Sequence, residues 1–305
     1  MPILERDPWR LQFFAHVKCP ENVMIPTDDL DCWNLFPAHR WVYEKVLVAQ
    51  SQRLACGLHG ALPDSYPVFS KPNINLKGMG TGSVVIGHAE DMVKHNQPGH
   101  MWMQLLRGPH ISTDCVVIDG DVRWMRHAVG TSGVGGTFKY WTIEAADNPT
   151  LEAMIALWVK RHMSGYCGMM NFETIDGRII ETHLRFADQW CDLYGLGWVE
   201  ALVRLYSEQV WQFNDASRQV GYSVPLFAHH GGSFFHPAPE VQARIRSLPQ
   251  VKSLQITFHE EKANETQPMP PGGFRLAIVN TTDLQAGFAA RNELALAFPV
   301  AKFLD

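Results

Sequence analysis

The chain has 305 residues, 46% of them hydrophobic, and a formal net charge of −5. A chain of this length buries roughly three-quarters of its unfolded surface and is large enough for its core to divide, so we expect lobes. The acidic balance excludes the broad basic surface of a nucleic-acid-binding protein, and no apolar run approaches the ~20 residues that span a bilayer. The six cysteines are widely spaced and the first residues do not resemble a signal peptide, so we expect a cytoplasmic protein with reduced thiols and no membrane partner.

Helical and strand-like spacings alternate through the first third of the chain. Apolar residues recur at helical intervals in 39–55, and glycines and a proline follow them as helix-ending residues. The predicted elements are, in order, a helix at 39–55, a strand at 66–71, a strand at 83–88 and a short helix at 89–96. The strand-like stretch 101–128 contains Asp119-Gly120, which predicts a hairpin.

Hairpins and single helices continue through the rest of the chain. The predicted elements are helices at 149–164 and 197–212, a hairpin at 167–186, strands at 253–259 and 274–280, and a helix at 284–298. A glycine cluster from Gly130 to Gly136 predicts a mobile loop, and we expect loops around 126–141 and 222–236. Because hairpins replace regular βαβ alternation, the pattern predicts an α+β fold.

The predicted hairpin at 167–186 carries an unusual set of polar residues on its two strands. These residues are Asn171, Glu173, Glu181, His183 and Arg185. With a plain two-residue Asp-Gly turn, Phe172 would pair with Glu181 and the two polar faces would be opposed. One bulge or a three-residue loop would instead bring Glu181 beside Asn171 or Glu173. Buried charges need partners, so the hairpin predicts a metal or polyphosphate site; the alternative is a solvated face with surface ion pairs.

A lysine and a glycine-rich loop form a second candidate cluster. Lys71 ends an apolar strand, where a lysine either reaches the surface or meets an anion such as phosphate. The loop that follows contains Gly78, Gly80 and Gly82, and glycines let backbone N–H groups approach phosphates. The loop matches neither the P-loop nor the GxGxxG pattern, so the alternative is an ordinary turn.

Two further segments contain candidate site residues, but neither one predicts a particular site. Arg126 and His127 follow the first Asp-Gly turn and face either a pocket or the surface. The histidines at 229, 230 and 236 have no cysteine or carboxylate at zinc-like spacing, so zinc is not expected. Aromatic residues in the two predicted loops indicate either a ring-bearing substrate or core packing.

The order of these parts resembles the ATP-grasp superfamily, in particular its carboxylate–amine ligases. The resemblance covers residues 60–190 and depends on YPVFSKP, the GxGxGS loop, the connector WMQLLRG and the final polar hairpin. It implies an ATP-grasp-like α+β fold, with two lobes enclosing a nucleotide cleft. The implied segments are a reduced N-terminal segment at 1–60, a small lobe at 61–108, a large lobe with the metal site at 109–220, and a C-terminal closing segment at 221–305.

The resemblance assigns roles to individual residues. Lys71 matches a lysine that contacts nucleotide phosphates, and Glu181 matches a metal-bridging carboxylate. The implied nucleotide-binding residues are Lys71, Gly78, Gly80, Thr81, Gly82, Ser83, Gln104, Leu105 and Leu106. The implied metal ligands are Asn171, Glu173, Glu181 and His183. The implied catalytic residues are Lys71, Arg126 and Arg185, with Arg275 as a further candidate.

Two positions depart from the family pattern. Asn171 stands where the family has Asp or Glu, and His183 stands where it has Asn, so the ligand set carries less negative charge. An imidazole shifts the preferred ion from Mg²⁺ toward Mn²⁺ or another transition metal, and Glu173 would supply the missing carboxylate. The segment before Lys71 is short for this family. The resemblance therefore implies that a partner protein, a second copy of the chain or the C-terminal tail completes the acceptor pocket.

The implied function is an ATP-dependent ligase with ATP and Mg²⁺ as cofactors. Such an enzyme activates a carboxylate as an acyl phosphate and joins it to an amine, so small carboxylates and amines are the expected partners. Two alternatives stay open. One is a phosphotransferase on the same scaffold, and the other is a catalytically inactive nucleotide-binding protein.

Overall fold

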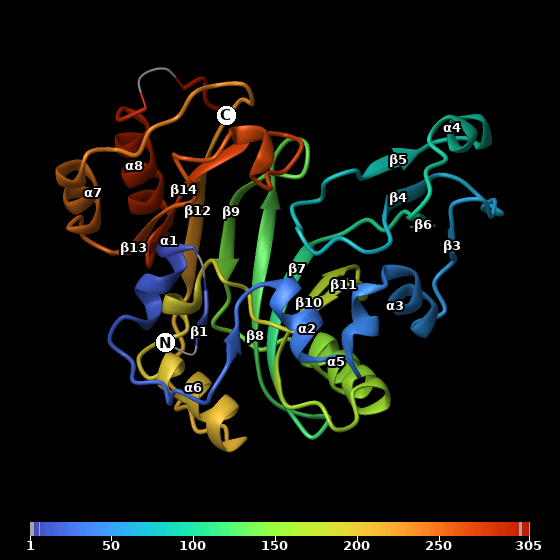
Figure 1. Cartoon of the computed structure of the whole chain (residues 1–305), viewed down its shortest axis with the longest axis horizontal. Coiled ribbons are helices and arrows are strands. Elements are labelled where there is room, and N and C mark those ends of the chain that lie inside the picture. The colour runs from blue at the N-terminus through green and yellow to red at the C-terminus, as the bar shows by residue number, and fades with distance from the viewer. Residues whose placement is uncertain (1–2, 6, 299–300, 305) are drawn as a thin grey trace. The chain divides into compact units, whose positions relative to one another are not determined.

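The computed structural model describes residues 3–5, 7–298 and 301–304, which divide into two compact units (Figure 1). The hairpin unit contains Pro26–Met125 and Pro149–Phe186, and the terminal unit contains Met1–Ile25, Arg126–Asn148 and Ala187–Asp305. Helices and antiparallel strands are mixed in both, so the predicted α+β class is confirmed. Each described helix is too short or too polar to pass through a bilayer. The division into four segments stays a prediction.

The hairpin unit contains two groups of strands. One group has the order β3, β6, β4, β5, with bounds Cys56–Leu58, His100–Gln104, Val68–Pro72 and Val84–Ile86. The other has the order β11, β10, β7, β8, with bounds Arg178–His183, Gly168–Ile175, His110–Ile118 and Asp121–Ser132. Only the start of β8 belongs to this unit, and the strand continues into the terminal unit. The helices are α2 Asp29–Leu35, α3 Lys45–Ser51, α4 Ala89–Lys94 and α5 Pro149–His162.

The apolar side chains of α5, β6 and β10 pack in the core of the hairpin unit. On α5, Ile155 and Trp158 lie on the buried side, and the Trp158 ring packs edge-on against Phe172 of β10 at 5.5 Å. On β6, alternate residues are shared between two clusters: Met101 packs with α3, and Trp102 packs with Met92 of α4. The period-two alternation of a strand therefore covers both faces of the small sheet.

The predicted single helix at 39–55 is wrong in one respect. Glu44 has extended backbone and divides the segment into a 3₁₀ helix, Arg40–Tyr43, and α3. The backbone N–H groups of Lys45 and Val46 donate to the carbonyl and side-chain oxygens of Asn73, at 3.0 and 2.9 Å. Asn73 thus satisfies the first donors of α3, which a continuous helix would have bonded internally. The break places Lys45 at a helix start.

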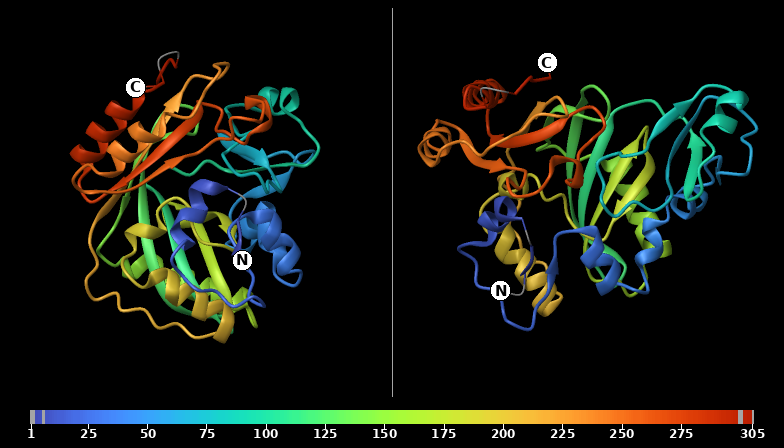
Figure 2. Two further views of the ribbon diagram at one scale, coloured as in Figure 1. Left: turned by 60° about the vertical axis from the view of Figure 1, so that its left-hand side comes forward. Right: turned by 45° about the horizontal axis from the view of Figure 1, so that its top comes forward.

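The strands of the terminal unit have the order β8, β9, β12, β14, β13. The bounds are β9 Phe138–Ile143, β12 Gly221–Ala228, β13 Val251–Ile256 and β14 Phe274–Thr281. The helices are α1 Pro8–Leu11, α6 Trp198–Glu208, α7 Pro239–Arg246 and α8 Leu284–Ala295, with 3₁₀ helices at Gln12–Phe14, Cys191–Leu193 and Asn264–Thr266. A short ladder joins β1 Ile3–Leu4 to β2 Ile25–Pro26. Helices α7 and α8 pack on the strands β12 to β14, as Figure 2 shows, and Ile245 and Leu294 enter the shared core.

Both loops expected around 126–141 and 222–236 are wrong in large part. The first contains the rest of β8, a short turn and the start of β9, and the second contains most of β12. Trp141 is buried and its ring centroid lies 4.2 Å from that of Phe138, so these two side chains pack against each other, whereas Phe235 is 69% exposed. No strand is predicted from the sequence at β12, which contains Pro225, because proline is unusual in a central strand. The ladder with β9 uses only Gly221, Tyr222 and Ser223, so Pro225 lies beyond it.

Candidate functional site

The strand pair β10–β11 combines a two-residue turn with one bulge. Both turn residues have left-handed backbone, with φ of 51° and 64°, as a tight hairpin requires. The pairing then shifts so that Ile180 is extra, Glu173 faces Glu181, and Asn171 faces His183. Of the alternatives drawn from the sequence, the bulge is confirmed. It places the four residues predicted as metal ligands at directly facing positions.

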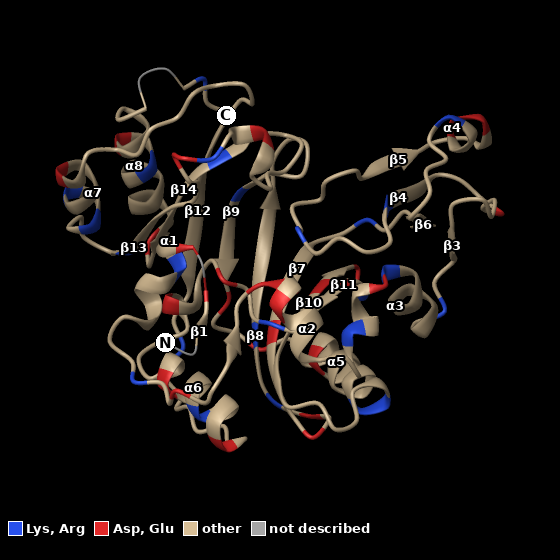
Figure 3. Cartoon of the chain, in the orientation of Figure 1, with Lys and Arg blue, Asp and Glu red and all other residues tan. Residues whose placement is uncertain are grey.

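Two buried lysines approach β11 from other elements. Figure 3 colours all Lys and Arg blue and all Asp and Glu red along the ribbon. Lys71 of β4 is 5% exposed, and its Nζ donates to the carbonyl oxygen of Ile180 at 2.6 Å. Lys45 of α3 is also 5% exposed, and its Nζ lies 3.0 Å from Glu181 Oε1. The surface alternative for Lys71 is therefore wrong. Burial lowers the pKa of Lys71 to about 8, although the Glu181 carboxylate opposes the effect. An anion placed beside this ammonium would favour its charged form.

Asp29, the first residue of α2, connects three side chains of the same unit. Its carboxylate lies 3.0 Å from His183 Nδ1 and 3.0 Å from both Nε and Nη2 of Arg185. The hydroxyl of Tyr43 donates to the same carboxylate at 3.1 Å. Burial alone would raise the pKa of Asp29, but Arg185 and His183 outweigh it and hold this pKa well below its usual range. Asp29 is therefore a charged, fully bonded support for His183 and Arg185.

The other two predicted ligands are held by β7. Asn171 Nδ2 donates to Asp114 Oδ1 at 2.7 Å and to Ser112 Oγ at 2.8 Å, so only its Oδ1 can face a cation. Glu173 Oε2 lies 3.1 Å from His110 Nε2. Burial would raise the pKa of Glu173, but the hydrogen bond from His110 lowers it, so Glu173 stays ionised. Glu173 faces Glu181 across the hairpin.

Among the described residues, no three His, Cys, Asp or Glu side chains converge closely enough to hold a metal ion by themselves. Of the predicted ligands, Glu181 Oε1 and His183 Nε2 are 3.9 Å apart. Magnesium in nucleotide sites is usually held by one or two carboxylates together with phosphate oxygens and water. The oxygens of Glu173 and Glu181 fit that arrangement. The four-ligand metal site stays a prediction.

The glycine-rich loop follows β4 and is left-handed at several positions. Positive φ values occur at Gly78, Met79, Gly80 and Gly82, which explains why glycine is used there. The side chain of Asn75 donates to the carbonyl of Gly78 at 2.8 Å and anchors one end of the loop. The roles of Thr81, Ser83 and the glycines in binding phosphate stay predictions.

Strand β6 ends at Gln104, whose backbone N–H donates to the carbonyl of Ala55 at 2.8 Å, and the connector follows it. Leu106 packs against the cluster formed by α3 and β6. The nucleotide-binding roles of Gln104, Leu105 and Leu106 stay predictions.

Arg126 belongs to the terminal unit, where it is 1% exposed. Its Nη1 lies 3.3 Å from Asp215 Oδ1, and its Nη2 donates to the carbonyl of Gln219 at 2.7 Å. His127 beside it is also buried, so the surface alternative for both residues is wrong. A catalytic role for Arg126 stays a prediction.

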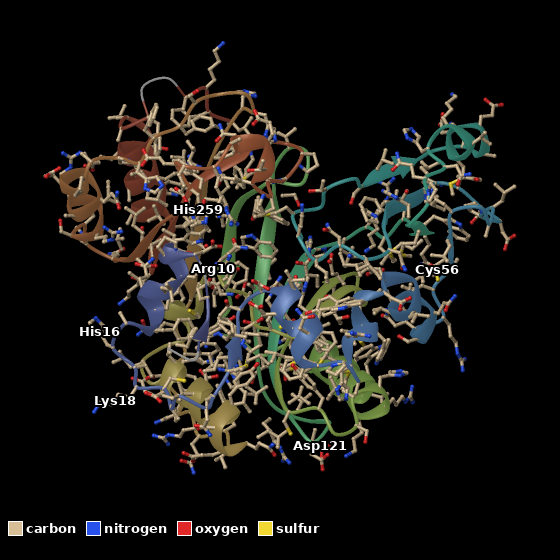
Figure 4. All side chains as sticks on the ribbon, in the orientation of Figure 1. Arg10, His16, Lys18, Cys56, Asp121 and His259 are labelled. Atoms are coloured by element: carbon tan, nitrogen blue, oxygen red, sulfur yellow. The ribbon has the colours of Figure 1, made fainter. Side chains whose placement is uncertain are left out.

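Arg275 lies in a charged cluster of the terminal unit. Asp7 accepts hydrogen bonds from Arg10 and, at 3.0 Å, from His259, and both donors are labelled in Figure 4. Burial lowers the pKa of Arg275 to about 10, while Asp188 opposes the effect. The nearby carboxylates make this cluster an unsuitable clamp for an anion.

Sequence reasoning missed four residues of the hairpin-unit site: Asp29, Lys45, His110 and Asp114. In the sequence, Asp29 belongs to the segment DDLD, which is typical of a helix start. The Asp28 side chain accepts a hydrogen bond from the backbone N–H of Asp31 at 2.8 Å. Lys45 lies inside the segment 39–55, whose apolar spacing predicts a helix and gives no sign of a site. Asp29 and His183 are 154 residues apart, and no local pattern reports such a contact.

No protein-family model and no curated protein matches the sequence. The fold nevertheless matches many solved structures. The L-amino acid ligase of Bacillus licheniformis is 12% identical, with 97% of this chain and 83% of that chain covered at a TM-score of 0.65. The phosphoribosylamine–glycine ligase of Thermotoga maritima is 13% identical, with 93% and 85% covered at 0.65. The N5-carboxyaminoimidazole synthase of Aspergillus clavatus is 11% identical, with 94% and 78% covered at 0.59. At these identities the comparison concerns architecture, and the chain has the ATP-grasp fold.

Proposed function

We propose that this protein is an ATP-dependent ligase that activates a carboxylate as an acyl phosphate and joins it to an amine. The observation that carries the proposal is the bulge at Ile180. Through it, Glu173 faces Glu181, and the carbonyl of Ile180 accepts a hydrogen bond from Lys71. Two carboxylates and two buried ammonium groups, those of Lys71 and Lys45, therefore belong to one cluster.

The chemistry of this cluster suits a metal–polyphosphate complex. Facing carboxylates repel each other, and a divalent cation beside Glu173 and Glu181 would relieve that repulsion. Lys71 and Lys45 would bind phosphate oxygens as point charges. The cation would supply Lewis acidity and offset the charge that spreads over the transferred phosphoryl group.

The solved structures that share the fold support the nucleotide assignment. The Aspergillus clavatus synthase was solved with ADP and 5-aminoimidazole ribonucleotide, and a biotin carboxylase domain from Hydrogenobacter thermophilus was solved with MgADP and bicarbonate. ATP with Mg²⁺ is accordingly the proposed cofactor pair. Small carboxylates and amines are the proposed partners.

The test is a screen of carboxylate and amine mixtures for ADP release. The variants Lys71→Met and Glu181→Gln should each reduce the rate by about 100- to 1000-fold, as expected when one stabilising group is removed. Lys160→Met and Glu293→Gln are matched controls, because both residues form exposed ion pairs elsewhere, and they should leave the rate unchanged. Turnover as fast in Lys71→Met as in the parent would contradict the site.

The substrate requirement separates the ligase from the other candidates. A ligase releases ADP only when the acid and the amine are both present, whereas a phosphotransferase forms a phosphorylated product with one acceptor. A non-catalytic protein binds nucleotide without turnover. The last candidate gains support from Lys45 and Asp29, which already pair with Glu181 and His183, two of the predicted metal ligands.

A further inference from the structure

The outer edge of β11 is covered at Ile179 by a side chain instead of a strand. Among the described strands, β11 is the last of its group, with β10 on one side. The backbone N–H of Ile179 donates to Gln52 Oε1 at 2.7 Å, and Gln52 Nε2 donates to the carbonyl of Ile179 at 2.8 Å. One carboxamide therefore makes both hydrogen bonds that a neighbouring strand would make at this residue.

The orientation of this carboxamide is fixed by its partners. The N–H of Ile179 is a donor, so the atom that faces it must be the amide oxygen of Gln52. The amide nitrogen has two hydrogens, and it donates the second to the carbonyl of Val48 in α3 at 3.2 Å. Gln52 directly follows the last residue of α3, so it joins the end of that helix to β11.

Ile179 lies directly before the extra residue of the bulge, Ile180. The plain and the bulged pairings of the hairpin differ by one residue, and a slip of one residue turns every side chain of a strand to the opposite face. A contact that holds both backbone groups of Ile179 therefore favours the pairing in which Glu181 faces Glu173.

The next two residues of β11 are held in a different way. Lys71 donates to the carbonyl of Ile180, and Lys45 pairs with Glu181. Both lysines are proposed to bind phosphate oxygens, so a nucleotide would compete for their contacts with β11. The contact from Gln52 involves no charged group and would persist when the nucleotide binds.

We propose that Gln52 is a positioning residue of the nucleotide site. By holding Ile179 it maintains the bulge, and through the bulge it keeps the Glu181 carboxylate and the Ile180 carbonyl in register with their partners. The inference rests on the proposed function and adds a residue that acts through the backbone of β11 rather than by contact with the nucleotide.

The first test compares Gln52→Met with Ser51→Ala in the full chain. Methionine has the length of glutamine without its hydrogen-bonding groups. Ser51→Ala is the matched control, because Ser51 Oγ accepts a bond from Trp158 Nε1 at 2.8 Å and donates one to Val48 at the same helix end. The MgADP affinity measured by calorimetry should fall by about 10- to 100-fold in Gln52→Met, as expected for a misplacement of about 1 Å, and should stay within about twofold of wild type in Ser51→Ala. Hydrogen exchange of the Ile179 amide in the free protein should be about 10-fold faster in Gln52→Met and unchanged in Ser51→Ala.

A second variant separates positioning from a general loss of stability. In Gln52→Glu, the protonated carboxyl group matches the carboxamide, with one acceptor and one donor, whereas the ionised form places a negative charge beside the carbonyl oxygens of Ile179 and Val48. The ratio of its MgADP affinity to that of wild type should therefore approach one at about pH 5 and be at least about 10-fold lower at about pH 8. The same ratio for Gln52→Met should not differ between these two pH values.

The outcomes distinguish this inference from the proposed function. Equal MgADP affinity in wild type and Gln52→Met, or an equal ratio at both pH values in Gln52→Glu, overturns the positioning role while nucleotide binding stands. An absence of MgADP binding in wild type overturns the proposed function, and the positioning role with it. If Gln52→Met does not fold, the comparison of Gln52→Glu with wild type at each pH still decides the result.

Discussion

Asp29 provides the sharpest test of how the hairpin unit is held together. Asp29→Ala removes the acceptor shared by His183, Arg185 and Tyr43, all at 3.0 to 3.1 Å. The side chains of Asp29 and Arg185 are 3% and 17% exposed, so little water replaces the lost contacts. Removing one partner of a buried ion pair costs about 3–5 kcal/mol, and we expect that loss in the free energy of unfolding. Asp29→Asn keeps one acceptor oxygen, so its cost should be about 2–3 kcal/mol.

The pH dependence of stability gives an independent signature. The pKa of Asp29 is held below its ordinary value of 3.8, because Arg185 and His183 outweigh burial. A depressed carboxyl pKa contributes stability that is present above about pH 4 and is lost as pH falls through the folded-state pKa. His183 acts in the opposite sense: burial lowers its pKa, but Asp29 outweighs burial and raises it above 6.5. The stabilisation from His183 is complete below pH 6.5 and is lost as pH rises through its folded-state pKa.

Urea unfolding followed by tryptophan fluorescence from pH 3 to 9 measures both effects. The free energy of unfolding of wild type should exceed that of Asp29→Ala by the largest margin between about pH 4 and 6.5, where Asp29 and His183 are both charged. Asp121→Ala removes an exposed ion pair with Lys160, which water and salt screen, so its effect on the free energy of unfolding should be small at every pH. A cost for Asp29→Ala no larger than that of Asp121→Ala would refute the buried support.

Three further predictions concern other parts of the chain. Burial raises the pKa of Asp192 from 3.8 to about 6 although Ser253 and Asn280 oppose it, so Asp192→Asn should stabilise the protein by about 2 kcal/mol at pH 7 and by almost nothing at pH 4 in urea unfolding. An added Cβ at Gly120 would lie 2.8 Å from the carbonyl oxygen of Met163, whereas at Gly165, with similar φ, it would meet nothing within 4 Å. Gly120→Ala should therefore cost more than Gly165→Ala by about 1–2 kcal/mol in thermal unfolding, and equal costs would contradict the contact. Because the pKa of Lys71 is about 8 in the free protein, ADP affinity measured by calorimetry should fall as pH rises above 8 in wild type but not in Lys71→Met.

Sequence reasoning succeeded where the determinants were local. The Asp176-Gly177 turn, the amphipathic helix α6 and the strand that contains Lys71 follow from turn chemistry and apolar periodicity. It failed at β12, where Pro225 argued against a strand, and at Glu44, where Asn73 from a distant segment ends the helix. In both cases a partner far along the chain overrides the local preference.

In the candidate site too, local features could be predicted from the sequence and long-range contacts could not. The sequence alone identified the polar residues of the hairpin. It also gave the two possible strand pairings, one with a plain two-residue turn and one with a bulge. The choice between the registers depends on Ile180, whose carbonyl oxygen is bonded to Lys71, 109 residues away. The supports Asp29 and Lys45 come from helices whose only sequence signals concern helix formation, so their roles required the tertiary structure.

The bulge and its lysine also constrain which ligand the site accepts. Glu173, Glu181, Asp29 and Asp114 bring four negative charges, and Lys45, Lys71 and Arg185 bring three positive charges. A cluster with so little net charge attracts a bare polyphosphate weakly, because the carboxylates repel its oxygens. A divalent cation bound to the phosphates reverses that repulsion at the carboxylates and leaves the lysines facing the remaining oxygens. We therefore expect the metal–nucleotide complex to bind as a unit, with ADP in excess chelator binding far more weakly than ADP with the cation.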